Sequence, residues 1–393
     1  MSGPEQRVLI VGANMAGTAA ALALRKVGIE AIAFDRMPAM PSMNGGLHIW
    51  TNGAKALEWL RLGRVREGGA PVNLLEFRSY RGPVLLRANV GAMAEKWGDG
   101  PFFIPREDLP RNMHAELPDE AVQWGRNVTG YSQDAKGVTL RFADGGEERG
   151  AVLLGADGIN STTRTAVQGE VKPRSAGYQD WGAVVQNFTH PKAPEGYYPT
   201  YWGRGIRFGI ANIGQGRIYW AAALPRPEGS TTDPPELSEM LERFAGWPEP
   251  IADVIKATDP GAFYGAQIRD LKTLPRWGER RVTLAGDAAH AMTPNAGRGA
   301  SEGLEDAVVL AQILRRVDMR DPARVDSALR EYEERRRKAT SSVVALSRQI
   351  GMLGKWSNPL LNTGRAAYIR AINVPTVVGM RQDFRASLNG GAP

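Results

Sequence analysis

Apolar and polar positions at the start of the chain alternate as strand, helix and strand. Residues 7–11 form an apolar run of strand length, and residues 16–27 repeat alanine and leucine at helical spacing before Gly28. Residues 30–34 form a second apolar run. This order predicts a strand–helix–strand unit, and therefore a parallel α/β sheet at the amino end.

The pattern changes further along the chain. Helical periodicity predicts helices over residues 52–62, 107–117, 237–245, 304–315 and 328–352, and apolar runs predict strands over 137–142, 151–155 and 281–287. From about residue 173, aromatic and β-branched residues alternate with glycine. Residues 74–86, which contain a Gly-Pro turn, predict a hairpin or edge strands, and residues 207–224 predict a hairpin of an antiparallel sheet.

These elements predict a discontinuous α/β fold. Residues 1–73, 101–172 and 268–346 supply the parallel domain, and residues 74–100 and 173–267 supply an inserted antiparallel-sheet domain. Residues 347–393 form a carboxyl-terminal helical tail.

Composition excludes several classes of site. The 393 residues include no cysteine, which excludes disulfides and thiolate metal sites, and the four histidines lack zinc-site spacing, so we predict no metal. The net charge of +7 is dispersed apart from the basic run at residues 335–338, for which a solvated helix face is favoured over a nucleic-acid contact. No apolar stretch is long enough for a membrane span or a secretory signal, so we expect a cytoplasmic protein.

The first candidate loop is "VLIVGANMAG". Gly12 and Gly17 occupy the first and third places of the dinucleotide pattern G-x-G-x-x-G, and Asn14 occupies the middle place. The amino end of the following helix offers N–H groups and a positive dipole to a pyrophosphate. Asp35 ends the second strand 18 residues after Gly17 (35 − 17), near the spacing of a ribose-binding acid. A nucleotide site is therefore favoured over a plain strand–helix turn.

Two later loops have the same strand–loop–helix form. In "LLGADGINSTTR", Asp157-Gly158 follows a strand and Ser161 is a candidate helix cap. In "GDAAHAMTPNAGRGASEGLED", Asp287 follows a strand and residues 294–300 present backbone N–H groups. The same stretch contains G-x-S-x-G around Ser301, but the strand ends 15 residues earlier (301 − 286) and no histidine follows residue 290. A hydrolase nucleophile is therefore not predicted.

These motifs, in this order, together with "PREDL" at residues 105–109 and "EDAVVLA" after the third loop, resemble the group A flavin-dependent aromatic monooxygenases of the para-hydroxybenzoate-hydroxylase-like family. The resemblance extends from residue 7 to about residue 337, and "GGLHIWTNGAKAL" is closest to urate-hydroxylase-like and epoxidase-like members. It implies a Rossmann-like FAD-binding domain beneath an inserted substrate sheet. It also implies hydroxylation of an aromatic or heteroaromatic small molecule with NADH or NADPH and O2, through a flavin C4a-hydroperoxide.

Two alternatives remain open: an epoxidase of an alkene-containing intermediate, and a non-catalytic small-molecule binder with the same fold. The substrate, the choice between NADH and NADPH, and a monomer or homodimer are not distinguished by the sequence.

The resemblance also implies residue roles. Contacts with FAD are expected from Gly12, Asn14, Ala16, Gly17, Asp35, Arg36, Gly46, Arg106, Val128, Asp157, Gly158, Asp287, Pro294, Gly297, Arg298, Gly299 and Ala300. Two of these positions depart from the family pattern: Asn14 replaces a glycine, and Arg298 replaces a glutamine. Arg298 could stabilise an anionic flavin or substrate, or it could point to solvent, and solvent is the preferred interpretation.

His48 is a candidate base beside the flavin, or alternatively a packed histidine. In the inserted sheet, candidate substrate contacts are Arg207, Phe208, Tyr219 and Trp220, with Trp202 and Ile210 nearby. Because side chains alternate along a strand, only half of these residues can face a substrate, and the sequence does not say which half.

Overall fold

The computed structural model describes residues 6–92, 94 and 98–371 of an elongated molecule. Its first sheet has five parallel strands in the order β17-β11-β1-β2-β7. They are β17 (Val282–Leu284), β11 (Val152–Gly155), β1 (Val8–Val11), β2 (Ala31–Phe34) and β7 (Val122–Gln123). The predicted strand–helix–strand opening is confirmed, with α1 (Met15–Lys26) between β1 and β2. Strands distant in sequence thus become neighbours in one sheet.

Helix α9 (Gly299–Leu314) packs across α1 and begins five residues before the predicted position. Its first two turns contain Gly299 and Gly303, and glycine is a weak helix former. A Cβ built on Gly303 would lie 3.4 Å from the Ala16 Cβ, and one on Gly53 would lie 2.6 Å from the Ser301 Oγ. Close approach of α1 and α2 (Thr51–Leu60) therefore requires these small residues.

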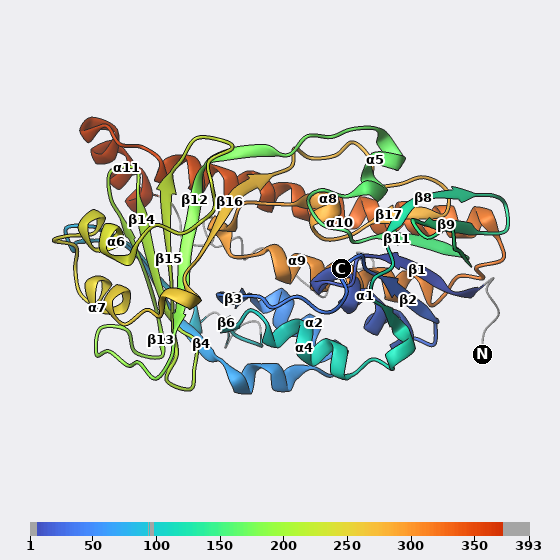
Figure 1. The fold of residues 1–393 in the computed structure, drawn as a ribbon, viewed down its shortest axis with the longest axis horizontal. Coiled ribbons are helices and arrows are strands. Elements are labelled where there is room, and N and C mark those ends of the chain that lie inside the picture. Colours follow the sequence, from blue (N-terminus) through green and yellow to red (C-terminus); the bar gives the residue numbers. More distant parts are fainter. Residues whose placement is uncertain (1–5, 93, 95–97, 372–393) are drawn as a thin grey trace.

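The second sheet has nine strands and stands at the opposite end of the molecule (Figure 1). Its path is β16 (Tyr264–Asp270), β12 (Arg174–Val185), β15 (Ile218–Pro225), β14 (Arg207–Asn212), β13 (Gly196–Trp202), β4 (Ala70–Ser79), β6 (Phe102–Pro105) and β3 (Gly46–Ile49), and β5 (Val84–Asn89) pairs with β4. Both predicted hairpins are confirmed, as β4–β5 and β14–β15. The expectation of a purely antiparallel sheet is wrong at one place, because β13 and β4 run parallel.

The two faces of this sheet differ in composition. One face packs against α6 (Leu237–Arg243) and α7 (Ile251–Lys256), which cover its outer side in Figure 1. Its side chains are large and apolar, with Trp181, Phe208 and Trp220 each at most 1% exposed. The other face, which we call the open face, carries Asp180, Gly182, Tyr198, Thr200, Arg207, Gly209, Tyr219, Ala221 and Ala223 along β12 to β15, and Tyr264 on β16.

The remaining elements complete the two ends. A small sheet of β10 (Glu147–Gly150), β9 (Val138–Phe142) and β8 (Val128–Gln133) adjoins the parallel sheet, and the other helices are α4 (Asp108–Ala115), α5 (Thr162–Gln168), α8 (Asp287–His290), α10 (Pro322–Gly354) and α11 (Pro359–Ala371). Short 3-10 helices are η2 (Gly63–Gly68), η3 (Asp119–Ala121), η4 (Pro260–Ala262) and η5 (Pro294–Ala296).

The long helix α10 connects the two ends of the molecule (Figure 1). It begins at Pro322, where Asp321 accepts hydrogen bonds from the two N–H groups of Ala323 and Arg324, and it is longer than the predicted helix. The predicted domain boundaries after residues 73, 267 and 346 fall inside β4, β16 and α10, respectively. Residues 372–393 of the predicted tail lie outside the described residues. Within the described residues, no helix has the length and apolar character needed to cross a membrane.

Candidate functional site

The three candidate loops meet at the carboxyl edge of the parallel sheet. Val11 on β1 pairs with Gly155 on β11, and Gly155 pairs with Leu284 on β17. Gly12 has φ +99°, and a Cβ built on it would lie 2.5 Å from the Ala156 carbonyl oxygen. The three loops therefore lie side by side at one edge of the sheet.

The first loop is held by its own side chains. Asn14 has an extended backbone and caps α1 by accepting a hydrogen bond from Met15 N at 2.7 Å, so its place does not require a left-handed residue. A Cβ on Gly17 would lie 1.9 Å from the Gly12 carbonyl oxygen, which explains the glycine. The two carboxylate oxygens of Asp35 accept hydrogen bonds from Ala13 N (2.8 Å) and Met37 N (2.9 Å), and each oxygen keeps a second lone pair.

In the second loop, the carboxylate of Asp157 is hydrogen-bonded to the first turn of helix α5. Asp157 accepts hydrogen bonds from the Ser161 Oγ at 2.5 Å and from the Thr163 N–H at 3.0 Å, and Ser161 caps α5 as predicted by accepting from Arg164 N. Gly158 has φ +76°. Any contact of this loop with a ligand would therefore use its backbone rather than the Asp157 carboxylate.

The third loop presents an accessible acid. Asp287 is exposed, yet burial by the surrounding protein raises the pKa of its carboxyl, with His290 and Arg106 opposing the change. Arg106 is exposed beside it and is fixed through its backbone N–H, which donates to the Gly45 carbonyl at 2.9 Å.

Several other predicted residues adjoin these loops. A Cβ on Gly286 would lie 2.6 Å from that of Ala16, and a Cβ on Gly297, where φ is +63°, would lie 2.9 Å from the Nδ1 of His48. Val128 packs on the cluster that contains Val11 and Phe34, and Arg36 is exposed after β2. Pro294 begins η5, Gly299 and Ala300 lie in the first turn of α9, and Gly46 begins β3.

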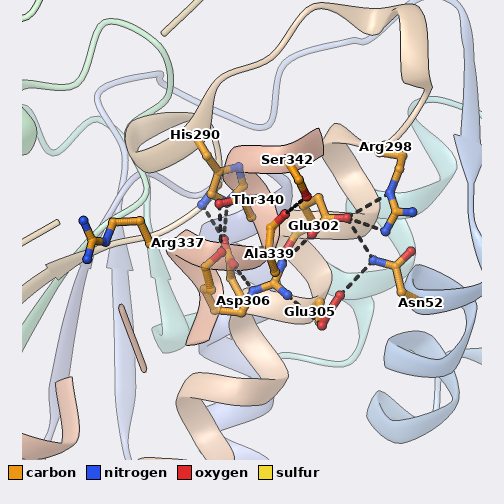
Figure 2. Close-up of polar contacts among 12 residues, drawn as sticks. Asn52, His290, Arg298, Glu302, Glu305, Asp306, Arg337, Ala339, Thr340 and Ser342 are labelled. Carbon is orange, nitrogen blue, oxygen red and sulfur yellow. Dashed lines mark hydrogen bonds and ion pairs between the residues drawn. The ribbon is translucent and has the colours of Figure 1, made fainter. Parts of the chain in front are cut away.

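Arg298 does not point to solvent, so the preferred interpretation of this residue was wrong. It is 4% exposed, and its Nη2 lies 2.6 Å from the Glu302 Oε1 within a group of buried charges (Figure 2). Asn52 on α2 donates to both Glu302 and Glu305. A cation that replaces a neutral residue is thus neutralised by the first turn of α9.

Arg336 of α10 is the centre of this group, which we call the Arg336 network. It is fully buried and lies 2.6–2.7 Å from carboxylate oxygens of Glu302, Glu305 and Asp306. Asp306 also accepts from Gly286 N, and it lies 2.6 Å from His290, where its charge and hydrogen bond outweigh burial and raise the pKa of the histidine. The basic run at residues 335–338 is therefore not wholly a solvated face.

His48 is buried between aromatic rings. It stacks on Phe103 with 4.5 Å between ring centroids, and the ring of Tyr198 lies 6.0 Å away. Burial, reinforced by the positive charge of Arg298, lowers the pKa of His48 to about 3, and the Nε2 atom has no hydrogen-bond partner among the described residues. A neutral imidazole this weakly basic is poorly matched to removing a substrate proton. The packed alternative describes it better.

We expect replacement of His48 by phenylalanine to flatten the acid dependence of stability. The unfolded histidine titrates near 6.5, so between pH 6.5 and about 3 the unfolded chain binds one more proton than the folded chain. The unfolding free energy of the parent protein therefore falls as pH drops, by up to about 1.4 kcal/mol per pH unit. Urea unfolding of both proteins from pH 4 to 8 measures the difference. Parallel profiles would mean that the folded protein carries a protonated His48.

The structure divides the predicted substrate residues into two sets. Arg207 and Tyr219 lie on the open face, whereas Phe208 and Trp220 stack on each other at 5.1 Å in the core under α6 and α7, so those two predictions were wrong. Ile210 lies in that core as well, and Trp202, paired with Arg207, is 3% exposed in a separate apolar cluster.

Other open-face residues were missed: Asp180, Tyr198 and Tyr264. The sequence offered one signal for Asp180, because an acidic residue is unusual within a strand rich in aromatic residues.

The open face meets the candidate loops directly. Tyr178 on β12 donates to the Asn295 Oδ1 of η5 at 3.1 Å. A Cβ on Gly46 would lie 2.5 Å from the ring of Tyr219. Ser301 of the G-x-S-x-G match is fully buried, and its Oγ accepts from Trp50 N at 3.0 Å. It therefore serves packing, and a hydrolase nucleophile is again not indicated.

The loop residues fit an FAD molecule. The first turn of α1 has backbone N–H groups without intrahelical partners, and the glycines before it lack the Cβ atoms that would block a pyrophosphate. Asp35 and Asp287 stand at separate places along the same sheet edge, as the two ends of an extended dinucleotide require.

Comparison with known proteins agrees with this fit. A family model described as an FAD binding domain matches residues 5–347. The aurachin C monooxygenase/isomerase of Stigmatella aurantiaca is 34% identical over 89% of this chain and 90% of its own length. The FAD-dependent urate hydroxylase of Klebsiella pneumoniae is also 34% identical, over 84% of this chain and 85% of its own length.

The structure of Klebsiella pneumoniae HpxO complexed with FAD and uric acid superimposes with a TM-score of 0.87 at 29% identity, covering 97% of both chains. With the three strand-end loops, the inserted sheet and these relatives in agreement, the chain belongs to the FAD-binding-domain family of group A flavin-dependent aromatic monooxygenases.

Proposed function

We propose that the protein is a monooxygenase that uses FAD, NADH or NADPH, and O2 to hydroxylate a planar aromatic or heteroaromatic small molecule. One observation supports this proposal above all. The edge of the parallel sheet, which has the loops of a dinucleotide site, lies against the open face of the nine-stranded sheet, which has small residues at its centre. Relatives named as urate, aminohydroxybenzoate and hydroxynicotinate hydroxylases or monooxygenases support the substrate class.

Each of the loops would bind a different part of the FAD molecule. The amino end of α1 with Gly12 and Gly17 would hold the pyrophosphate, Asp35 the ribose, and Asp287 with Arg106 the ribityl region. Residues 294–300 would then adjoin the flavin ring. When bound and reduced by NADH or NADPH, FAD supplies the activation of O2.

The inserted sheet would hold the substrate and exclude water. Its outer face is closed by the apolar core under α6 and α7, and its open face is joined to the loops by Tyr178 and Asn295. Exclusion of water protects a reactive oxygen species from wasteful decay. His48, neutral at working pH, would pack beside the ring and offer a nitrogen as a hydrogen-bond partner rather than act as a base.

We also propose that the division into an FAD-binding part and a substrate part leaves β4 and β16 whole, with both strands assigned to the inserted sheet. A cytoplasmic location and a small-molecule partner remain part of this proposal. Epoxidation of an alkene is the second candidate, because the relatives include a monooxygenase/isomerase as well as hydroxylases.

The test is a substrate panel run on the FAD-loaded protein. We expect an oxygenated product, with one NADH or NADPH consumed per product, from a ring such as urate, 6-hydroxynicotinate or 3-amino-4-hydroxybenzoate. NAD(P)H oxidation and product mass are followed together. Purified protein that contains FAD but oxygenates neither rings nor alkenes would contradict the proposal and favour a non-catalytic binder.

A further inference from the structure

Asp180 is an acid without the partners that other acids of the same sheet have. Asp270, on the neighbouring strand β16, is fully buried and paired with Arg174 and Arg348 at 2.8–2.9 Å. Within the described part of the chain, nothing donates a hydrogen bond to the Asp180 carboxylate, and the residue keeps accessible surface. Asp180 therefore has acceptor capacity that the folded protein does not use.

The strand register places a cation opposite this acid. Asp180 pairs with Ala223, and Ala223 pairs on its other side with Arg207. Two strand spacings separate the Cα atoms of Asp180 and Arg207 by roughly 10 Å. The next row of the same face consists of Gly182, Ala221 and Gly209. Ala223, between the acid and the cation, and these three residues beside it project little or no side chain from the sheet.

The other titratable groups facing Asp180 are tyrosines from four strands. Burial raises the pKa of Tyr198 to about 12 and also raises the pKa values of Tyr178, Tyr219 and Tyr264. Protonated phenols donate hydrogen bonds but do not take up a proton at neutral pH. Burial raises the pKa of Asp180 to about 6, with the Arg207 charge opposing it, which leaves an ionised carboxylate near the working pH.

We propose that Asp180 takes the proton from an acidic hydroxyl or ring N–H of the substrate, while Arg207 holds the electron-rich opposite edge of the same ring. The substrate is therefore a phenol or lactam-type heterocycle, not a simple alkene. The O–H or N–H bond breaks, the proton joins a carboxylate oxygen, and the electron pair stays on the ring, where it makes the carbon to be oxygenated more nucleophilic. The proton returns to solvent through the accessible carboxyl when the product leaves. This inference rests on the proposed monooxygenase function.

The experiment measures equilibrium binding to the FAD-loaded protein by the change in flavin absorbance. The probes are matched rings with and without the acidic group: 6-hydroxynicotinate against nicotinate, and 3-amino-4-hydroxybenzoate against 3-aminobenzoate. We expect the hydroxylated ring of at least one pair to bind about tenfold or more tightly at pH 7. Asp180→Asn should abolish this preference, and Asp180→Glu should restore part of it. Glu228→Gln, which removes an exposed carboxylate from a loop, should leave it unchanged.

Binding makes the outcome independent of turnover. No preference in the parent protein, or a preference that survives in Asp180→Asn, overturns the assignment even if the protein is an active monooxygenase. Failure of the proposed function would appear separately, as binding without oxygenated product. If Asp180→Asn does not retain FAD, the Asp180→Glu variant is measured instead, in the same assay between pH 5 and 8. A binding preference with the same pH dependence in Asp180→Glu as in the parent protein also overturns the assignment.

Discussion

Replacing Arg336 by methionine is expected to lower the unfolding free energy by about 3–5 kcal/mol. Methionine retains much of the volume but leaves the buried carboxylates of Glu302, Glu305 and Asp306 without their common counter-charge. Of the remaining cations, Arg298 lies beside Glu302 and His290 lies beside Asp306. Urea unfolding of the FAD-free protein, followed by circular dichroism, gives the midpoint and the free energy.

The matched control is Lys338→Met on the same helix. Lys338 is exposed, so the same change in charge and side-chain type is expected to alter stability by less than about 0.5 kcal/mol. Equal unfolding midpoints for the two variants would show that the Arg336 network contributes no more to stability than an exposed charge does.

Replacing Gly12 by alanine is expected to weaken FAD binding by about a hundredfold or more, which corresponds to about 2.7 kcal/mol. The new Cβ would lie 2.5 Å from the Ala156 carbonyl oxygen, so β1 and β11 cannot keep their register at the edge where the pyrophosphate would bind. The residue must also hold φ at +99°, which alanine adopts only with strain. Fluorescence titration of the FAD-free protein with FAD measures the dissociation constant.

Gly28→Ala separates these two effects. Gly28 has φ +83°, but a Cβ there meets nothing within 4 Å. It therefore shares the backbone strain without the collision, and we expect its FAD affinity to change by less than about threefold. If the two variants bind FAD equally, the close approach of the first two loops is not a requirement for the cofactor.

Local signals were sufficient where an element depends on its own residues. The limits of β1, α1 and β2 were predicted to within one residue, because each apolar run is bounded by polar residues or glycine. The start of α9 could not be predicted in this way. The two glycines in its first turns are weak helix formers, and this segment is helical where α1 and α2 pack against it.

Residues that depend on distant partners were the main errors. Arg298 is buried beside Glu302, which belongs to the Arg336 network. The central cation of that network is 38 residues away (336 − 298) on α10. In β14 and β15, alternation separated Arg207 and Tyr219 from Phe208 and Trp220, but only the position of α6 and α7 decides which set is covered. Likewise, the parallel pairing of β13 with β4 joins segments more than a hundred residues apart, for which the chain carries no local signal.

The order of strands in the parallel sheet has a consequence for biosynthesis. β1 and β2 leave the ribosome first, yet β11 enters between β1 and β17, and β17 begins only at Val282. The second edge of β1 therefore stays unpaired until β11 has been made, and the outer edge of β11 stays unpaired until β17 has been made. A nascent chain that ends before β17 also lacks Asp287 and residues 294–300, so it cannot yet form the complete FAD site that we propose.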